Sequence, residues 1–132
     1  MNGVDVIGGL LRSSADLTDA WPAESIKAGM LPEGELGILV RSISLIDYQT
    51  LAQEALVRST ERVSVTVRAK TYRDQVIAMK LIRRACAGVI ATAIGDARNI
   101  SVLTAGTGPD VIGPGNTFEQ AQDFRVSFDA PA

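Results

Sequence analysis

The residues with the clearest potential for chemistry lie in a stretch rich in glycine and proline, TAGTGPDVIGPGN, at positions 104–116. Glycine-rich loops bind phosphates in the pattern G-x-x-x-x-G-K-[ST], placed between a strand and a helix. Here no lysine follows the glycines, two prolines remove N–H donors, and the next segment alternates like a strand. A dinucleotide fingerprint fails too, because Gly108 precedes Pro109 and no βαβ unit surrounds them. We therefore expect a connecting loop, long enough to make contacts with another molecule.

Other reactive groups are few, since the sequence has no histidine and one cysteine, Cys86. Without histidine, the usual serine triads, Cys–His dyads and His-based zinc sites are excluded. Cys86 lies in an apolar helical stripe with no base to activate it, so we expect a small core residue. Three acidic pairs lie in no recognisable motif and are expected to be solvated: Asp16 with Asp19, Glu33 with Glu35, and Asp47 with Glu54. The sequence predicts no catalytic residue, cofactor or metal site, and a protein that is not an enzyme.

Composition favours one globular domain over residues 1–132. Hydrophobic residues make up 46% of the chain, the formal net charge is −2, and no apolar run is long enough to span a membrane. No signal peptide is evident, so we expect a soluble protein in a reducing cytoplasm, at least initially. Four basic residues on one strand could meet nucleic acid, acids of a neighbouring subunit, or water: Arg58, Arg62, Arg68 and Lys70. The nearly neutral charge and 5% aromatic content argue against a dedicated nucleic-acid reader.

Hydrophobic periodicity predicts four strands, at residues 36–48, 55–70, 99–105 and 122–128. In the first, the apolar positions change parity near Arg41–Ser42, which indicates either a bulge or a strand buried on both faces. The second has the cleanest alternation, typical of a half-buried strand. Its apolar face consists of Val63, Val65, Val67 and Ala69.

Two helices are expected, a short one at residues 3–13 and a long one at 71–87 that ends near Gly88. Thr71 and Asp74 resemble a capping box at the start of the long helix. Residues 14–25 look like a connecting loop, a short extended piece is expected around Ile26, and 89–98 is ambiguous between helix and loop. The order of elements predicts an α+β fold: a mostly antiparallel sheet of four to five strands, with both helices packed on one face.

Three quoted stretches, read after the amino-terminal helix, carry a resemblance to a known family. They are LPEGELGILVRSIS (31–44), RVSVTVRAKTYRDQVIAMKLIRRACAG (62–88) and SVLTAGTGPDVIGPGNTFEQAQDFRVSF (101–128). In this order they resemble the tail-completion, or tail-terminator, proteins of long-tailed phages, prophages and gene-transfer agents. The resemblance covers nearly the whole chain and rests on pattern and element order, because the family has no catalytic signature. Its most specific parts are VTVRAKTYRDQ and DFRVSF.

The resemblance implies a structural role in a virion. Such proteins form a ring, typically of six copies, on the head-proximal end of the tail tube, where they stop tube growth and dock the head connector. The implied partners are further copies of the chain, the tail tube protein and a connector or stopper protein. DNA passes through the lumen without sequence-specific binding, and no membrane or cofactor is involved. The expected location is the tail–head junction of the virion, and the host cytoplasm during assembly.

Two long loops, 48–56 and 104–116, are the expected contact regions. Their candidate contact residues are Tyr48, Gln49, Leu51, Gln53, Glu54, Thr107, Asp110, Ile112 and Asn116. Other functions stay open at this point. The nearest is another neck component, such as a head–tail adaptor or stopper. The others are a small enzyme using carboxylates, and a monomeric binding module that adds a partner strand to an exposed sheet edge.

Overall fold

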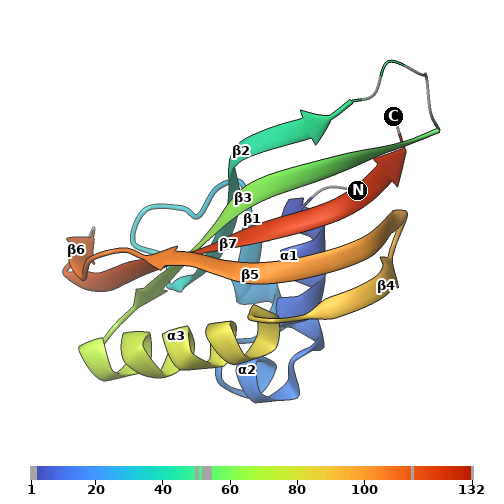
Figure 1. The fold of residues 1–132 in the computed structure, drawn as a ribbon. Helices are drawn as coiled ribbons and strands as arrows, with labels where there is room; N and C mark the ends of the chain where they lie inside the picture. Colours follow the sequence, from blue (N-terminus) through green and yellow to red (C-terminus); the bar gives the residue numbers. More distant parts are fainter. Residues whose placement is uncertain (1–2, 50, 52–54, 114, 132) are drawn as a thin grey trace.

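The computed structural model describes residues 3–49, 51, 55–113 and 115–131. In this part of the chain, helices cover one face of a seven-stranded sheet (Figure 1). The helices are α1 (Gly3–Ser13), α2 (Ala15–Ala20) and α3 (Tyr72–Cys86), with a 3-10 turn at Ala23–Ser25. The strands are β1 (Ile26–Ala28), β2 (Gly37–Tyr48), β3 (Leu56–Ala69), β4 (Ile90–Ile94), β5 (Ala97–Thr107), β6 (Val111–Gly113) and β7 (Thr117–Pro131).

The sheet has the strand order β1-β2-β3-β7-β5-β4, with β6 paired to one end of β7. β1 runs parallel to β2, and the other pairs are antiparallel. The predicted α+β class is confirmed, whereas the expected sheet of four to five strands is too small. The extra strands are short ones that gain stability only from their neighbours: β1, β6 inside the glycine-rich stretch, and β4 in the ambiguous segment.

Residues 14–25, expected to be a loop, contain the additional helix α2. Ser14 stands at its N-cap, and its side-chain oxygen accepts a hydrogen bond from the Leu17 amide at 3.4 Å. Leu17 is fully buried and fixes this short helix against the core.

The helix α1 lies on the sheet through Val6, Ile7 and Leu11, all fully buried. Its first residue, Gly3, touches β3 so closely that a Cβ there would stand 3.0 Å from the Glu61 side chain. Glu61 is 1% exposed, and its Oε1 accepts a hydrogen bond of 3.0 Å from the Gly3 amide. A carboxylate at a helix amino terminus is favourable because the first N–H groups of a helix have no partners within it.

The long helix α3 begins as the sequence predicts. Thr71 is its N-cap and accepts a hydrogen bond from the Asp74 amide at 3.1 Å. Arg83 and Arg84 lie in its last turn, where positive charge favours the helix dipole. Its buried face packs on β3, β5 and β7 and consists of Gln75, Ala78, Met79, Ile82 and Cys86.

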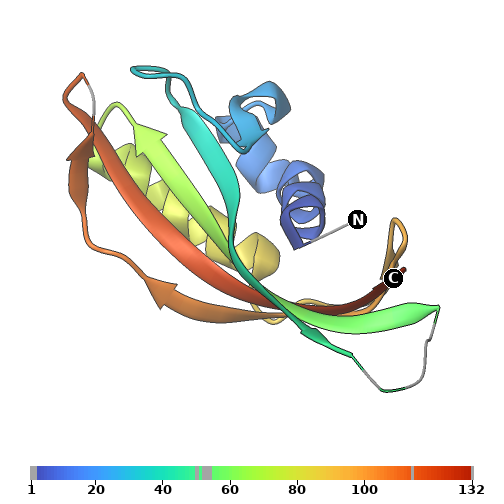
Figure 2. The same cartoon turned by 90° about the horizontal axis from the view of Figure 1, so that it is seen from above.

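The parity change in the first predicted strand is a bulge, because the register between β2 and β3 shifts between Ser42 and Ser44. The alternative, burial on both faces, is wrong, because residues 41–48 are exposed. β7 is longer than the predicted 122–128 and lies at the centre of the sheet, paired with β3, β5 and β6. Figure 2 shows the sheet curling around the helices, with the far end of the β2–β3 hairpin extending beyond them.

Candidate assembly surface

The outer half of the β2–β3 hairpin is the most unusual surface of the described chain. We call residues 41–48 of β2, with their partners 58–64 of β3, the arm. Ile43, Leu45, Ile46 and Tyr48 are each more than half exposed, at 52%, 51%, 56% and 57%. Isolated exposed apolar residues are normal, but four of them within six residues of one strand, on both of its faces, are typical of a surface that another molecule covers.

The backbone edge of β2 is covered over only part of its length. β1 pairs with Ile38–Val40, and the Gly29 amide adds one hydrogen bond to the Val40 carbonyl at 3.0 Å. From Arg41 onward no described strand covers this edge. An open groove of about 510 Å³ lies where the cover ends, lined by Val4, Asp5, Ala28, Gly29, Val40, Arg41 and Ser42.

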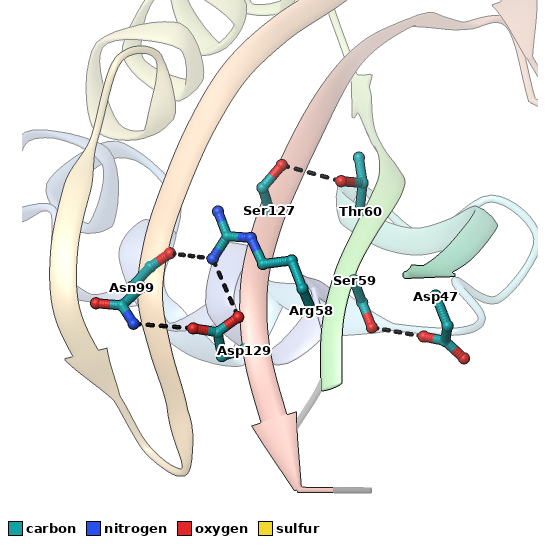
Figure 3. A network of polar contacts seen from close by, with 7 residues as sticks. All are labelled: Asp47, Arg58, Ser59, Thr60, Asn99, Ser127 and Asp129. Atoms are coloured by element: carbon teal, nitrogen blue, oxygen red, sulfur yellow. Dashed lines mark hydrogen bonds and ion pairs between the residues drawn. The ribbon is translucent and has the colours of Figure 1, made fainter. Parts of the chain in front are cut away.

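Polar contacts fasten the arm to the rest of the sheet. Figure 3 shows Arg58 reaching from β3 across β7, where its Nη1 donates to the Asn99 carbonyl at 2.7 Å and lies 3.5 Å from the Asp129 carboxylate. The side-chain amide of Asn99 also donates to the Asp129 carboxylate, at 2.8 Å. Three strands, β3, β7 and β5, are therefore joined at the outer end of the arm, where Arg58 pairs with Tyr48.

Two hydroxyl contacts add to this attachment. The Ser59 hydroxyl donates to the Asp47 carboxylate at 2.5 Å, which links the two strands of the arm (Figure 3). Thr60 and Ser127 share a hydrogen bond of 3.1 Å between β3 and β7. Because each contact crosses between strands, the arm is held as an extension of the sheet.

At the opposite end of the sheet, the glycine-rich stretch is tied down to α3 and β7. The Gln75 side chain, fully buried, donates to Asp110 at 2.8 Å and to Gln120 at 3.2 Å. Gln120 in turn donates to the Gly108 carbonyl at 2.9 Å, and the Tyr72 hydroxyl donates to Asp110 at 3.1 Å. The hydrogen bond and the charge of Asp110 raise the pKa of Tyr72 above its usual value. Much of the expected loop is thus ordered structure, with residues 104–107 in β5 and 111–113 in β6.

The predicted contact residues fall into two groups. Tyr48 ends β2, and Gln49 and Leu51 follow it as exposed residues. Gln53 and Glu54 lie outside the described residues. This group belongs to the end of the sheet where Leu56 pairs with Pro131.

The second group lies at the other end, where Ala69 pairs with Phe118. Thr107 donates to the Gln122 side chain at 2.6 Å, and Asp110 accepts the bonds from α3 already described. Ile112 on β6 is 69% exposed, and Asn116 precedes β7 with a positive φ of 59°. The structure does not bring the two groups together, because the length of β3 and β7 separates them (Figure 1).

Sequence reasoning missed the exposed apolar residues of the arm itself. Ile43, Leu45 and Ile46 were expected in a strand, with either a bulge or burial on both faces, and periodicity cannot show whether a helix covers that strand. The sequence did contain an indication of this surface. Apolar residues of both parities in one strand are typical either of a strand buried on both faces or of a strand that a partner covers. The edge strand β4, with Ile90 at 87% exposure, was missed as well.

No cluster of three or more His, Cys, Asp or Glu residues in the described ranges could hold a metal ion. Burial raises the pKa of Cys86 to about 12, so its thiol stays protonated at neutral pH. No helix in this part of the chain is long and apolar enough to cross a membrane.

Comparisons with known proteins bear on the fold. No protein-family model matches the chain, and no curated protein matches it in sequence. Among solved structures, the chain is similar to a chain of the virion of a native gene transfer agent (GTA) particle, with a TM-score of 0.62 and 14% sequence identity. The likeness covers 94% of this chain and 92% of that one, so the two share a fold over nearly their whole length.

Proposed function

We propose that the chain is a structural subunit of the virion of a phage or gene-transfer agent. The observation that carries this proposal is the fold shared with a chain of a gene transfer agent virion, over 94% of this chain and 92% of that one. The exposed apolar arm supports it, because a subunit of a particle must present surfaces that only its neighbours cover.

Within the virion, we propose that copies of the chain form a ring of six at the head-proximal end of the tail tube. The ring ends tube polymerisation, binds the last ring of tube protein on one side and the head connector on the other, and lets DNA pass through its lumen. The role is structural and not enzymatic. The family resemblance of the sequence supports this finer assignment, and two uncovered sheet edges supply the two different patches that a head-to-tail ring requires.

The test is deletion of the gene from the phage or agent that encodes it, followed by electron microscopy of the particles. A tube built from repeated head-to-tail contacts has no intrinsic end. Loss of a terminator is therefore expected to give tubes longer than the wild type and heads without tails. The wild-type gene supplied in trans is the control and restores normal particles.

Localisation separates the remaining outcomes. An antibody against the chain, or a reconstruction of the particle, is expected to place it at the last tube ring with sixfold symmetry. A position on the portal side, with unattached tails of normal length in the deletion, assigns it as an adaptor or stopper instead. Absence of the chain from purified particles contradicts the virion role altogether.

A further inference from the structure

Among the described residues, the sheet has a second edge that no strand covers, besides that of β2. β4 ends the strand order on the opposite side, and its sequence IATAI contains no charge, proline or glycine. Natural edge strands are usually protected by charged residues, prolines, bulges or a covering element, because their free N–H and C=O groups bind other strands. β4 contains no charged residue or proline that would protect its edge, and Ile90 is 87% exposed.

The outer edge of β2 has the same character. Residues 42–48 read SISLIDY, with one charge, and that charge is engaged by Ser59. A bulge lies at Ser42–Ser44, so the regular part of the free edge is Leu45–Tyr48. Its length is close to that of β4, which spans five residues.

We propose that β2 of one copy pairs antiparallel with β4 of the next copy, so that the sheets of neighbouring subunits join into one. This proposal rests on the ring proposed above and names the surfaces that build it. The two edges lie on opposite sides of one sheet, so the contact joins unlike patches, as a ring requires. A contact between two β2 edges would instead close a dimer and leave β4 bare.

Charge selects the antiparallel orientation. On β2, the opposite charges Arg41 and Asp47 are six positions apart. On the other edge, Asp96 follows β4 and is six positions from Ile90, where the strand begins soon after the basic last turn of α3. Antiparallel pairing sets Arg41 near Asp96, and sets Asp47 near the last turn of α3. Parallel pairing would place like charges together at both ends.

The basic turn of α3 is available for this contact. Arg84 is 73% exposed along its side chain and lies 4.0 Å from Asp16, a weak surface pair. Arg83 is exposed as well. Asp96 already takes part in an interaction within its own chain, so it contributes here as a nearby negative charge.

Disulfide trapping tests the pairing directly. In a register that sets Leu45 opposite Thr92, Asp47 falls opposite Ile90 and Arg41 falls within a residue of Asp96. Opposite residues of paired strands have the Cα separation that a disulfide needs. The full chain carrying both Leu45→Cys and Thr92→Cys is purified, oxidised and run on a non-reducing gel, and the expected result is a ladder of covalent multimers that ends at the copy number of the ring.

The matched controls are the two single variants and the wild type, whose own thiol, Cys86, is buried. Single variants are expected to give dimers at most, because each copy then carries one reactive thiol. A double variant that cross-links no further than the single variants overturns the proposal. Efficient dimers of Leu45→Cys alone also overturn it, in favour of pairing between two β2 edges.

Charge exchange gives a second readout that a folding defect would not imitate. Arg41→Glu and Asp96→Arg are each expected to weaken self-association by about twofold to fivefold at low salt, and the combined variant is expected to regain it. Arg73→Glu, an exposed position on α3, has the same charge change and is expected to leave association unaltered. If the losses of self-association affinity in the two single variants add in the combined variant, Arg41 and Asp96 do not contact each other across the interface.

These results are separable from those on the proposed function. A chain found at the tail–head junction but giving no ladder keeps its virion role and loses this interface. A chain that forms the ladder but is absent from particles keeps the interface and loses the role.

Discussion

The two halves of β2 contain similar residues in opposite surroundings. Ile38 and Val40 in the inner half are 0% and 1% exposed, whereas Leu45 and Ile46 in the outer half are 51% and 56% exposed. All four face residues of the same neighbouring strand, β3. Part of the difference comes from β1, which pairs with Ile38–Val40 and ends before the arm begins.

This contrast distinguishes two roles that apolar side chains can have on the same strand. In the inner half, burial within the chain stabilises the monomer by removing apolar surface from water. In the outer half the same residue types are exposed and contribute little to the monomer; in the proposed ring a neighbouring copy would cover them. If the proposed assembly is correct, folding depends on the inner half of β2 and assembly on its outer half.

The largest expected effect comes from one substitution made in both halves. Ile38→Ala is expected to lower the free energy of unfolding by about 2–5 kcal/mol, because it leaves a cavity in the core. Ile46→Ala, the identical change on the exposed arm, is expected to stay within about 0.5 kcal/mol. Urea unfolding of the monomer measures both, and similar losses for the two variants would abolish the distinction.

A smaller effect is expected at the end of the sheet opposite the arm. Gln75→Ala removes the hydrogen bonds to Asp110 and Gln120 in a buried site and is expected to cost about 1–3 kcal/mol. Amide hydrogen exchange in residues 108–113 should accelerate more than in the core strands. Gln49→Ala, at an exposed position beyond β2, is the control. Unchanged exchange in 108–113 would show that these residues do not depend on α3.

Loosening the outer end of the arm is expected to have a still smaller effect. Asp129→Ala removes the acceptor of the bonds from Asn99 and Arg58, at a cost of about 1 kcal/mol. Exchange of arm amides should accelerate while the inner half of β2 stays protected. Asp19→Ala, an exposed change on α2, should leave the arm unaffected. Equal acceleration in both halves of β2 would mean that they open as one unit.

The smallest expected effect is one of pH. The folded-state pKa of Tyr72 is raised, chiefly by its hydrogen bond to Asp110, so the contact stabilises the protein fully below pH 10. That stability is lost as the pH rises through the folded-state pKa, because the phenol then gives up the proton it donates. Thermal unfolding should show the wild type losing stability above pH 10 relative to Tyr72→Phe. Parallel pH profiles of the two proteins would exclude this role for the tyrosine.

The elements that the sequence predicted well are those defined by local signals. Thr71 begins α3 because its side chain caps the next turn, and the parity change near Ser42 marked the bulge without knowledge of any partner. The extended piece expected around Ile26 is confirmed as β1, but its pairing with β2 was not predicted. β6 was missed, because three residues are too few to show a periodicity and the strand depends on its pairing with β7. Non-local pairing decides such strands.

The candidate surface was predicted in part. Tyr48, Gln49 and Leu51 were expected at an exposed hairpin end, and the structure places them there. Asp110 was expected as a contact residue, and the structure shows that its carboxylate already accepts bonds from Gln75 and Tyr72. The apolar arm escaped notice because residue type alone does not reveal which part of a strand other elements cover.

The central position of β7 has a consequence for biosynthesis. β3 and β5 both pair with β7 and not with each other, so until residues 117–131 have been synthesised the sheet exists as two separate halves. Such long-range pairing slows folding and leaves unpaired edges open to misassociation. The nascent chain therefore cannot complete its sheet until β7 has been synthesised. During that interval we expect chaperones to bind its unpaired strand edges.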